Sequence, residues 1–512
     1  MSENTLNFGF SALCANGDGR ITYEDVLRGQ DRLKVLKSRA AKSSLRLLWL
    51  LAGPGVLVML GENDGPSMVS YATTGATYGI GFFAPFILLT FLMAFVVQEM
   101  TVRLGAATHR GHAELIFQRF GPFWGYFAMG DLVFGNLLTL VTEFIAIQAG
   151  GLYFGVPAWA SVAIGAALVI GSLAFRRYAT WERVLMGLAV FNLLFVPAAL
   201  LAHPDGAALT HALATWGPLP GGFHTAFLTL VLANVGATVT PWMIFFQQSA
   251  VVDKGLTRAD VPQGRMDTAI GAVLAAVAAI ATLAAASPLF AAKVDVTQFA
   301  NGADFATALV PLIGSTGATL FALGMLEAGL IAAMTISTSS SYSLAETLSA
   351  AETTSARHSL NLDFAHGRLF YGAAIVSTII AAGVVLIPGA PLLAMTLTVN
   401  VIATLLMAPA LLLLLLANDA EIMGELANGR LANLAGGTIV GYLKLAGGIG
   451  RAIRAGPFAG RSRVDNAATP GLMRFFPSGP RVTARFSVAA GAHQGDANLK
   501  EAIAQPGRFA CR

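Results

Sequence analysis

Long apolar segments alternate with short polar connections along most of the chain. The clearest apolar runs are nearly free of charge and long enough to cross a bilayer, which takes ~20 residues in a helix. They are Phe82–Val97, Ala158–Phe175, Val184–Leu201, Ala269–Ala286, Leu369–Ile387 and Leu392–Leu416. This pattern predicts an all-α polytopic membrane protein.

Ten spans are expected, and two of them are interrupted. The first contains Asp64-Gly65-Pro66 and the sixth contains Thr240-Pro241. Interrupted segments at corresponding positions of two halves are typical of transporters built from inverted repeats. The pattern therefore predicts an inverted repeat of five plus five helices, with broken helices 1 and 6. The expected spans are 46–78, 81–102, 122–150, 157–175, 181–202, 224–251, 268–289, 316–346, 367–387 and 391–416.

The spans divide the chain into three parts. A cytoplasmic segment, 1–45, precedes the transmembrane core at 46–418, and a tail follows at 419–512. An eleventh helix at 431–450 is doubtful, because that stretch holds six glycines and Lys444. If it crossed the membrane, the basic tail would lie outside. We expect ten spans and a cytoplasmic tail that is otherwise disordered.

Charge supports the membrane assignment and gives an orientation. Charged residues make up only 12% of the chain, and hydrophobic residues make up 55%. Lys and Arg gather at 20–46 and in every second connection, whereas the intervening connections hold only Lys293. This bias predicts a cytoplasmic N-terminus in a multi-pass protein of the cell (inner or plasma) membrane. We attribute the basic N-terminal run to contact with anionic lipid rather than with nucleic acid.

Several other classes of function find no support in the sequence. No hydrolase triad, phosphate-binding loop or zinc-ligand spacing is present, so we expect no enzyme activity and no cofactor. The two cysteines, Cys14 and Cys511, suggest neither a disulfide framework nor a metal site. The first forty residues are polar, so we do not expect a cleavable signal peptide. No obligate protein partner is evident.

Two carboxylates accompany the break in the first span. Glu62 and Asp64 interrupt an apolar stretch that runs from Leu47 to Phe83. A carboxylate at bilayer depth is costly, and a broken helix there is tolerated only where protein or a cavity satisfies it. We predict that both face a cation. The alternative is a simple loop between two short helices.

An EF-hand-like loop precedes the first span. Residues 14–25 follow the twelve-residue calcium-loop spacing, with Gly19 at its sixth position. Cys14 occupies the first position, where an Asp is expected, and the last residue is an Asp rather than a Glu. The loop either binds Ca²⁺ or Mg²⁺ or is a degenerate remnant. Its candidate ligands are Asn16, Asp18, Arg20, Thr22 and Asp25.

Short motifs accompany both breaks: Gly53-Pro54-Gly55 followed by Asp64, and Ala237-Thr-Val-Thr240-Pro241. They resemble the motifs of the Nramp (natural resistance-associated macrophage protein) family of divalent-metal transporters. The resemblance covers about 46–418, including Arg103-Leu-Gly and Asn418-Asp419, and implies a LeuT-type inverted repeat. Where the family has Asp-Pro-Gly-Asn and Met-Pro-His, this chain has Asp64-Gly65-Pro66-Ser67 and Thr240-Pro241-Trp242. Together with Glu62, that variant resembles the branch called Nramp-related magnesium transporters.

The resemblance and ligand chemistry together suggest an ion site. A thioether favours soft ions, whereas the oxygen of Thr240 suits Mg²⁺ or, as a further cargo, Mn²⁺. Alternatively, Thr240 only relieves packing beside Pro241, and Ser67 only caps a helix. The expected metal site comprises Asp64, Glu62, Ser67 and Thr240, the carbonyls of Gly61 and Ala237, and Asn400 in helix 10.

The remaining departures concern proton coupling. Proton-coupled relatives have an Asp three residues before a Glu in helix 3, and a His after the helix 6 Pro. Here Glu143 matches that Glu, but Leu140 and Trp242 replace the other two. The loss of two titratable groups argues against tight coupling. We expect uncoupled alternating-access uptake into the cytoplasm.

Alternatives remain for single residues and for the whole chain. Asp131 and Glu327 are intramembrane acids. Each is either a residual relay or gating group, as Glu143 is, or a structural group. Trp242 is either a gate or an interior aromatic. The rival functions are a proton-coupled Mn²⁺/Fe²⁺ transporter, a sodium-coupled amino-acid symporter and a membrane metal sensor.

Overall fold

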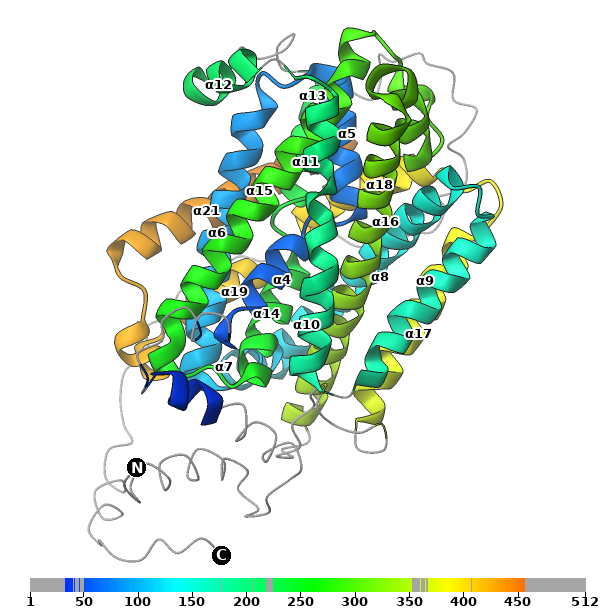
Figure 1. The fold of residues 1–512 in the computed structure, drawn as a ribbon. Helices are drawn as coiled ribbons and strands as arrows, with labels where there is room; N and C mark the ends of the chain where they lie inside the picture. The colour runs from blue at the N-terminus through cyan, green and yellow to red at the C-terminus, as the bar shows by residue number, and fades with distance from the viewer. Residues whose placement is uncertain are drawn as a thin grey trace, which may run out of the picture.

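The computed structural model describes residues 33–39, 41, 46, 50–175, 177–204, 206–217, 224–351, 360, 364, 367–406 and 408–455. All regular secondary structure within these ranges is helical, as Figure 1 shows, which confirms the all-α class. The EF-hand-like loop at 14–25 lies outside the described residues, so its ligands remain a prediction.

Nine helical segments of the described part are long and apolar enough to cross a membrane. The tenth expected span is the pair α4 (Pro54–Gly61) and α5 (Gly65–Tyr78), whose halves are each too short to cross alone. The nine are α6 (Phe83–Thr108), α8 (Pro122–Tyr153), α9 (Ala158–Ser172) with η1 (Leu173–Phe175), α10 (Tyr178–Ala189) with η2 (Val190–Leu194) and α11 (Phe195–Leu201), α13 (Thr225–Gly236) with α14 (Pro241–Lys254), η3 (Arg258–Asp260) with α15 (Val261–Ala291), α16 (Gly302–Ala351), α17 (Arg368–Val385), and α18 (Leu392–Leu405) with α19 (Ala408–Ala417).

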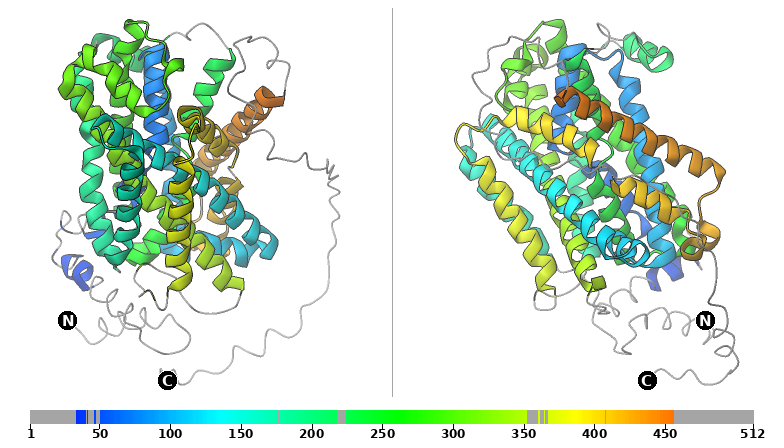
Figure 2. Two further views of the ribbon diagram at one scale, coloured as in Figure 1. Left: turned by 90° about the vertical axis from the view of Figure 1, so that its right-hand side faces the viewer. Right: turned by 180° about the vertical axis from the view of Figure 1, so that it is seen from behind.

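Short helices complete the described fold. They are α7 (His112–Phe120), α12 (Gly206–Thr215), η4 (Val296–Gln298), α20 (Ala420–Met423) and η5 (Gly424–Leu426). A last helix, α21 (Arg430–Ala455), runs obliquely across one face, and the right-hand view of Figure 2 shows it in orange.

Both expected breaks are present, and local chemistry explains each. The first break spans residues 62–64, and Pro66 lies in the first turn of α5. The second spans residues 237–240, and Pro241 begins α14. Proline has no N–H to offer a preceding turn and fits the start of a helix. Both prolines therefore end one half-helix and begin the next.

Close helix packing holds the broken helices in place. The half-helices α4 and α5 lie against α15, and α8 lies along α16. At Gly75 of α5, a Cβ atom would come within 2.2 Å of the Leu283 carbonyl oxygen of α15. Small residues at such positions allow membrane helices to approach each other closely.

Two spans differ from the expected pattern. Helix α16 begins at Gly302 instead of near residue 316, and it contains a kink at Gly314, where φ is 77°. Glycine adopts that backbone conformation without steric cost. The expected helix 10 is divided into two helices: α18 ends at Leu405, and Pro409 lies in the first turn of α19.

In the region where we expected a doubtful eleventh helix at 431–450 and an otherwise disordered tail, the structure has helices at residues 420–426 and 430–455. Arg119 of α7 holds the start of this region through ion pairs with Asp419 (2.6 Å) and Glu421 (2.9 Å). Helix α21 buries one apolar side, including Leu443, and exposes another, including Leu434. Its many glycines, Asn433 and Lys444 lower its hydropathy, and it is not among the nine candidate spans.

Candidate metal centre

Asp64 lies at the first break and starts the second half-helix. Its side chain is 1% exposed, and Oδ1 accepts a hydrogen bond from the Ser67 N–H at 2.8 Å. Asp64 is therefore the N-cap of α5, which satisfies one of the free N–H groups at the helix start. The alternative that Ser67 caps this helix is wrong, because Ser67 lies three residues inside it.

A side-chain hydrogen bond joins the two breaks directly. Thr240 Oγ1 donates to Glu62 Oε2 at 2.8 Å, across 178 residues of sequence. Glu62 is fully buried and Thr240 is 3% exposed. The hydroxyl oxygen of Thr240 therefore lies beside the carboxyl group of Glu62. This contact is additional to any packing role of Thr240 beside Pro241.

Glu143 brings a third carboxyl group to the break from α8. Its Oε2 accepts the Gly65 N–H at 2.9 Å, and the carboxyl faces Asp64. Gly65 has to be small here, because a Cβ atom would come within 2.2 Å of Ala146. The sequence suggests only a relay role for Glu143, whereas in the structure its carboxyl group lies beside Asp64.

Four buried oxygens around this break have no hydrogen-bonding partner: Glu62 Oε1, Asn63 Oδ1, Ser67 Oγ and Glu143 Oε1. A buried carboxylate without a partner is costly, so acceptors gathered around several carboxyl groups favour a bound cation. No salt bridge in the described residues reaches these acids. Within the described residues, no group of three His, Cys, Asp or Glu side chains is arranged to bind a metal ion by itself. Hydroxyl groups, carbonyl groups and water would have to complete the coordination of an ion.

The other expected ligands are Ala237, Gly61 and Asn400, and each has its own contacts in the structure. The Ala237 carbonyl accepts a hydrogen bond from Tyr71 Oη at 3.1 Å, a contact that the sequence did not suggest. Gly61 packs against Trp242, whose Cη2 atom is 3.3 Å from where a Cβ of Gly61 would lie. Asn400 donates to Ser70 Oγ at 2.9 Å, so it contacts α5 one turn beyond Ser67 rather than Asp64.

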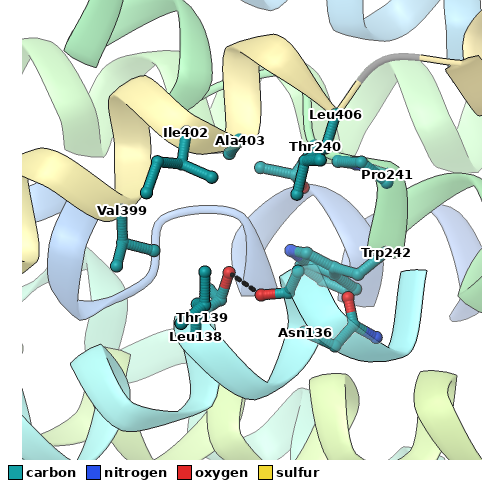
Figure 3. A pocket seen from close by; sticks show the side chains of 11 residues that line it. Asn136, Leu138, Thr139, Thr240, Pro241, Trp242, Val399, Ile402, Ala403 and Leu406 are labelled. Carbon is teal, nitrogen blue, oxygen red and sulfur yellow. Dashed lines mark hydrogen bonds between the residues drawn. The ribbon is translucent and has the colours of Figure 1, made fainter. Parts of the chain in front are cut away.

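Thr240 also borders a small cavity between α8, α14 and α18. Figure 3 shows Thr240, Pro241 and Trp242 facing Asn136 and Thr139 on one side and the apolar residues of α18 on the other. Trp242 is buried, and its carbonyl accepts the Ser339 hydroxyl at 3.0 Å. Neither Glu62 nor Asp64 lines this cavity.

Asp131 and Glu327 do not join the centre. Asp131 precedes Glu143 by twelve residues on α8, which is ~18 Å of helix. Glu327 lies on α16, with Asn192 of η2 as its polar neighbour. Both acids have buried oxygens without partners.

Comparisons with known proteins bear on the family and the fold. The family model described as "Natural resistance-associated macrophage protein-like" matches residues 55–449, well over half of the chain. The chain is similar to the divalent metal cation transporter MntH of Erwinia tasmaniensis, with 29% identity over 57% of this chain and 71% of that protein. It is similar to MntH of Deinococcus radiodurans, with 27% identity over 58% of this chain and 68% of that protein.

A solved structure shares the fold. The manganese transporter of Eremococcus coleocola has a TM-score of 0.65 and 20% identity, and the match covers 82% of this chain and 90% of that one. The expected inverted five-plus-five helix fold is confirmed. The two broken helices, the acids between them and the family match lead to one conclusion: the chain belongs to the Nramp family.

Proposed function

We propose that this chain carries a hard divalent cation, Mg²⁺ with Mn²⁺ as a further cargo, into the cytoplasm by alternating access. The observation that carries the proposal is the Glu62–Thr240 hydrogen bond, which joins the two helix breaks beside Asp64. Sites between two discontinuous helices are where transporters of inverted-repeat design bind their cargo. The chain would do this as a multi-pass protein with a cytoplasmic N-terminus.

The chemistry of the ligands supports a hard ion. The side chains at the centre offer carboxyl and hydroxyl oxygens from Asp64, Glu62, Thr240 and Ser67. The thioether of the next residue, Met68, accepts a hydrogen bond from Thr282 Oγ1 at 3.1 Å, on α15. Mg²⁺ prefers oxygen ligands and retains several waters, whereas Mn²⁺ and Cd²⁺ also accept softer ligands.

The surroundings of Asp64 support transport without proton coupling. Leu140 and Trp242 are both buried apolar groups at the positions where proton-coupled relatives carry Asp and His. An inside-negative potential contributes ~4.6 kcal/mol per 100 mV to the uptake of a divalent ion, at about 2.3 per elementary charge. That driving force is sufficient for accumulation without protons.

A second candidate is proton-coupled transport of Mn²⁺ or Fe²⁺. The names of the relatives, divalent metal and manganese transporters, favour manganese as the cargo. Proton coupling needs a titratable group, and Glu143 provides one beside Asp64. Proteoliposomes with an internal pH dye separate the two candidates. Uptake of Mg²⁺ without acidification supports our proposal. Mn²⁺ uptake that acidifies the lumen and resists excess Mg²⁺ contradicts it.

The exchange Thr240→Met tests the choice of ion. We expect Mg²⁺ uptake to fall about tenfold and Cd²⁺ uptake to rise about tenfold, since a thioether replaces a hydroxyl oxygen. The measurement is uptake of Mg²⁺, Mn²⁺ and Cd²⁺ into proteoliposomes.

A matched control is Thr229→Met on α13, where the hydroxyl donates within its own helix to Thr225. It should leave all three fluxes unchanged. An unaltered Mg²⁺/Cd²⁺ ratio in Thr240→Met would contradict a hard-ion site at this position.

A further inference from the structure

A short N-terminal helix at residues 33–39 packs against one end of the transmembrane core. Figure 1 shows it in dark blue at the lower end of the bundle. Val35 and Ser38, one turn apart, are 7% and 3% exposed, whereas Lys34 and Lys37 are exposed. One face of the helix is therefore held against the protein, and another carries positive charge. The metal centre does not include this helix.

The buried face of the N-terminal helix meets the ends of four transmembrane segments. Val35 belongs to an apolar cluster that also contains Leu51, which lies three residues before α4. The other members come from the end of α6, the end of α14, the connection after it and the start of α15: Val102, Ala106, Val251, Leu256 and Val261. The cluster thus connects the segment that leads into α4 with the ends of the three other segments.

An ion pair fixes the other end of the N-terminal helix. Arg39 Nη2 lies 2.6 Å from Asp260 Oδ1 and donates to the Ala259 carbonyl at 3.0 Å, and both partners lie in η3. The Asp260 side chain is fully buried, and its Oδ2 accepts the N–H and the hydroxyl of Thr257 at 3.0 and 2.7 Å. Hydrogen bonds between charged groups are stronger than neutral ones, so this contact anchors the helix beside the start of α15.

The half-helix α4 is joined to the chain by non-helical residues on both sides. They are Ala52 and Gly53 before it and the break at residues 62–64 after it. Transporters of inverted-repeat design alternate by moving one part of the bundle against another. Because of its two non-helical connections, α4 can swing as a rigid piece about the break. Such a swing would uncover Glu62 and Asp64 from the side on which α4 begins.

We propose that the N-terminal helix is a latch that holds α4 in its closed position. Its apolar face packs with the segment that leads into α4, and Arg39 anchors it to η3. Docking of the helix therefore favours the closed form of α4, and undocking favours the form that opens the metal centre. The inference rests on the proposed function only in naming the opened side cytoplasmic.

Hydrogen–deuterium exchange of the full chain in nanodiscs tests the latch without ion flux, because amide exchange within a helix reports how often that helix opens. Arg39→Ala should speed exchange of the α4 amides about tenfold, the order expected when a hydrogen bond to a charged group is lost. The matched control is Lys37→Ala, which removes an exposed positive charge from the same helix and should exchange as the wild type does. Since no ion is added, failure of the proposed cargo would leave this result unchanged.

A second variant and the pattern of exchange decide the outcome. Val35→Ala weakens the apolar contact instead of the ion pair and should also speed exchange in α4, which keeps the test valid if Arg39→Ala fails to fold. Faster exchange confined to the N-terminal helix and η3 overturns the proposal, because the helix would then be docked without holding α4. Equal α4 exchange in the Arg39 and Lys37 variants overturns it as well. So does an equal rise in every core helix, α8 included, since the whole fold would then be less stable.

Discussion

Asp64→Asn is expected to weaken divalent-ion binding by about 100-fold or more while leaving the fold intact. The variant removes a carboxylate at the centre of the site, and even residues that only support metal ligands contribute 10–100-fold to affinity. Asn is as good an N-cap as Asp, so the side-chain oxygen still accepts the Ser67 N–H and α5 still begins correctly. Calorimetric titration with Mn²⁺ and Mg²⁺, together with uptake assays, measures the effect.

Comparison with Asp64→Ala separates ion binding from folding. Alanine loses both the charge and the cap, which costs about 1 kcal/mol of stability in addition. We expect both variants to lose transport, but only Asp64→Ala to lower the thermal midpoint. Affinity within threefold of the wild type in Asp64→Asn would mean that Asp64 serves α5 alone.

Lys254→Met is expected to destabilise the protein by about 3–5 kcal/mol, because it leaves a buried carboxylate without its partner. Lys254 Nζ lies 2.7 Å from Glu182 Oε2, and the two side chains are 11% and 3% exposed. Lys254 also donates to the Ala52 carbonyl, just before α4. This cluster therefore joins α10 and α14 to the start of the first half-helix.

A double variant provides the control for this prediction. Glu182→Gln combined with Lys254→Met removes both charges and should regain most of the lost thermal stability. Asp267 of α15 would still accept the Gly53 and Gly55 N–H groups at 2.9 and 2.6 Å and hold the start of α4. A loss below about 1 kcal/mol in Lys254→Met would show that water screens the pair.

Much of the fold could be predicted from the sequence because a bilayer restricts the choices. Uncharged runs of sufficient length have to be helical in lipid, and prolines at 66 and 241, next to polar residues, indicate where two of them break. Pro409 is the same kind of signal for the interruption after Leu405, but the continuous apolar run at 391–416 predicts one unbroken helix. The kink at Gly314 was missed because an isolated glycine is also common in unbroken membrane helices.

The candidate site could be predicted only in part. Asp64, Glu62 and Thr240 stand out in sequence because polar groups at interrupted positions are costly in lipid. The Asn400 contact with Ser70 and the Tyr71 contact with Ala237 depend on helix rotation and crossing, which a uniformly apolar segment does not specify. Membrane helices lack the polar outer face that reveals orientation in soluble proteins.

The sequence by itself determined that this chain crosses a membrane as helices and that two of them break beside acidic residues. Local composition and proline are enough for both conclusions. Only the tertiary structure decided which polar groups meet across the breaks. The Glu62–Thr240, Asn63–Asn192 and Glu182–Lys254 contacts join residues 178, 129 and 72 positions apart. Such contacts arise when distant helices pack, and no local pattern in the chain encodes them.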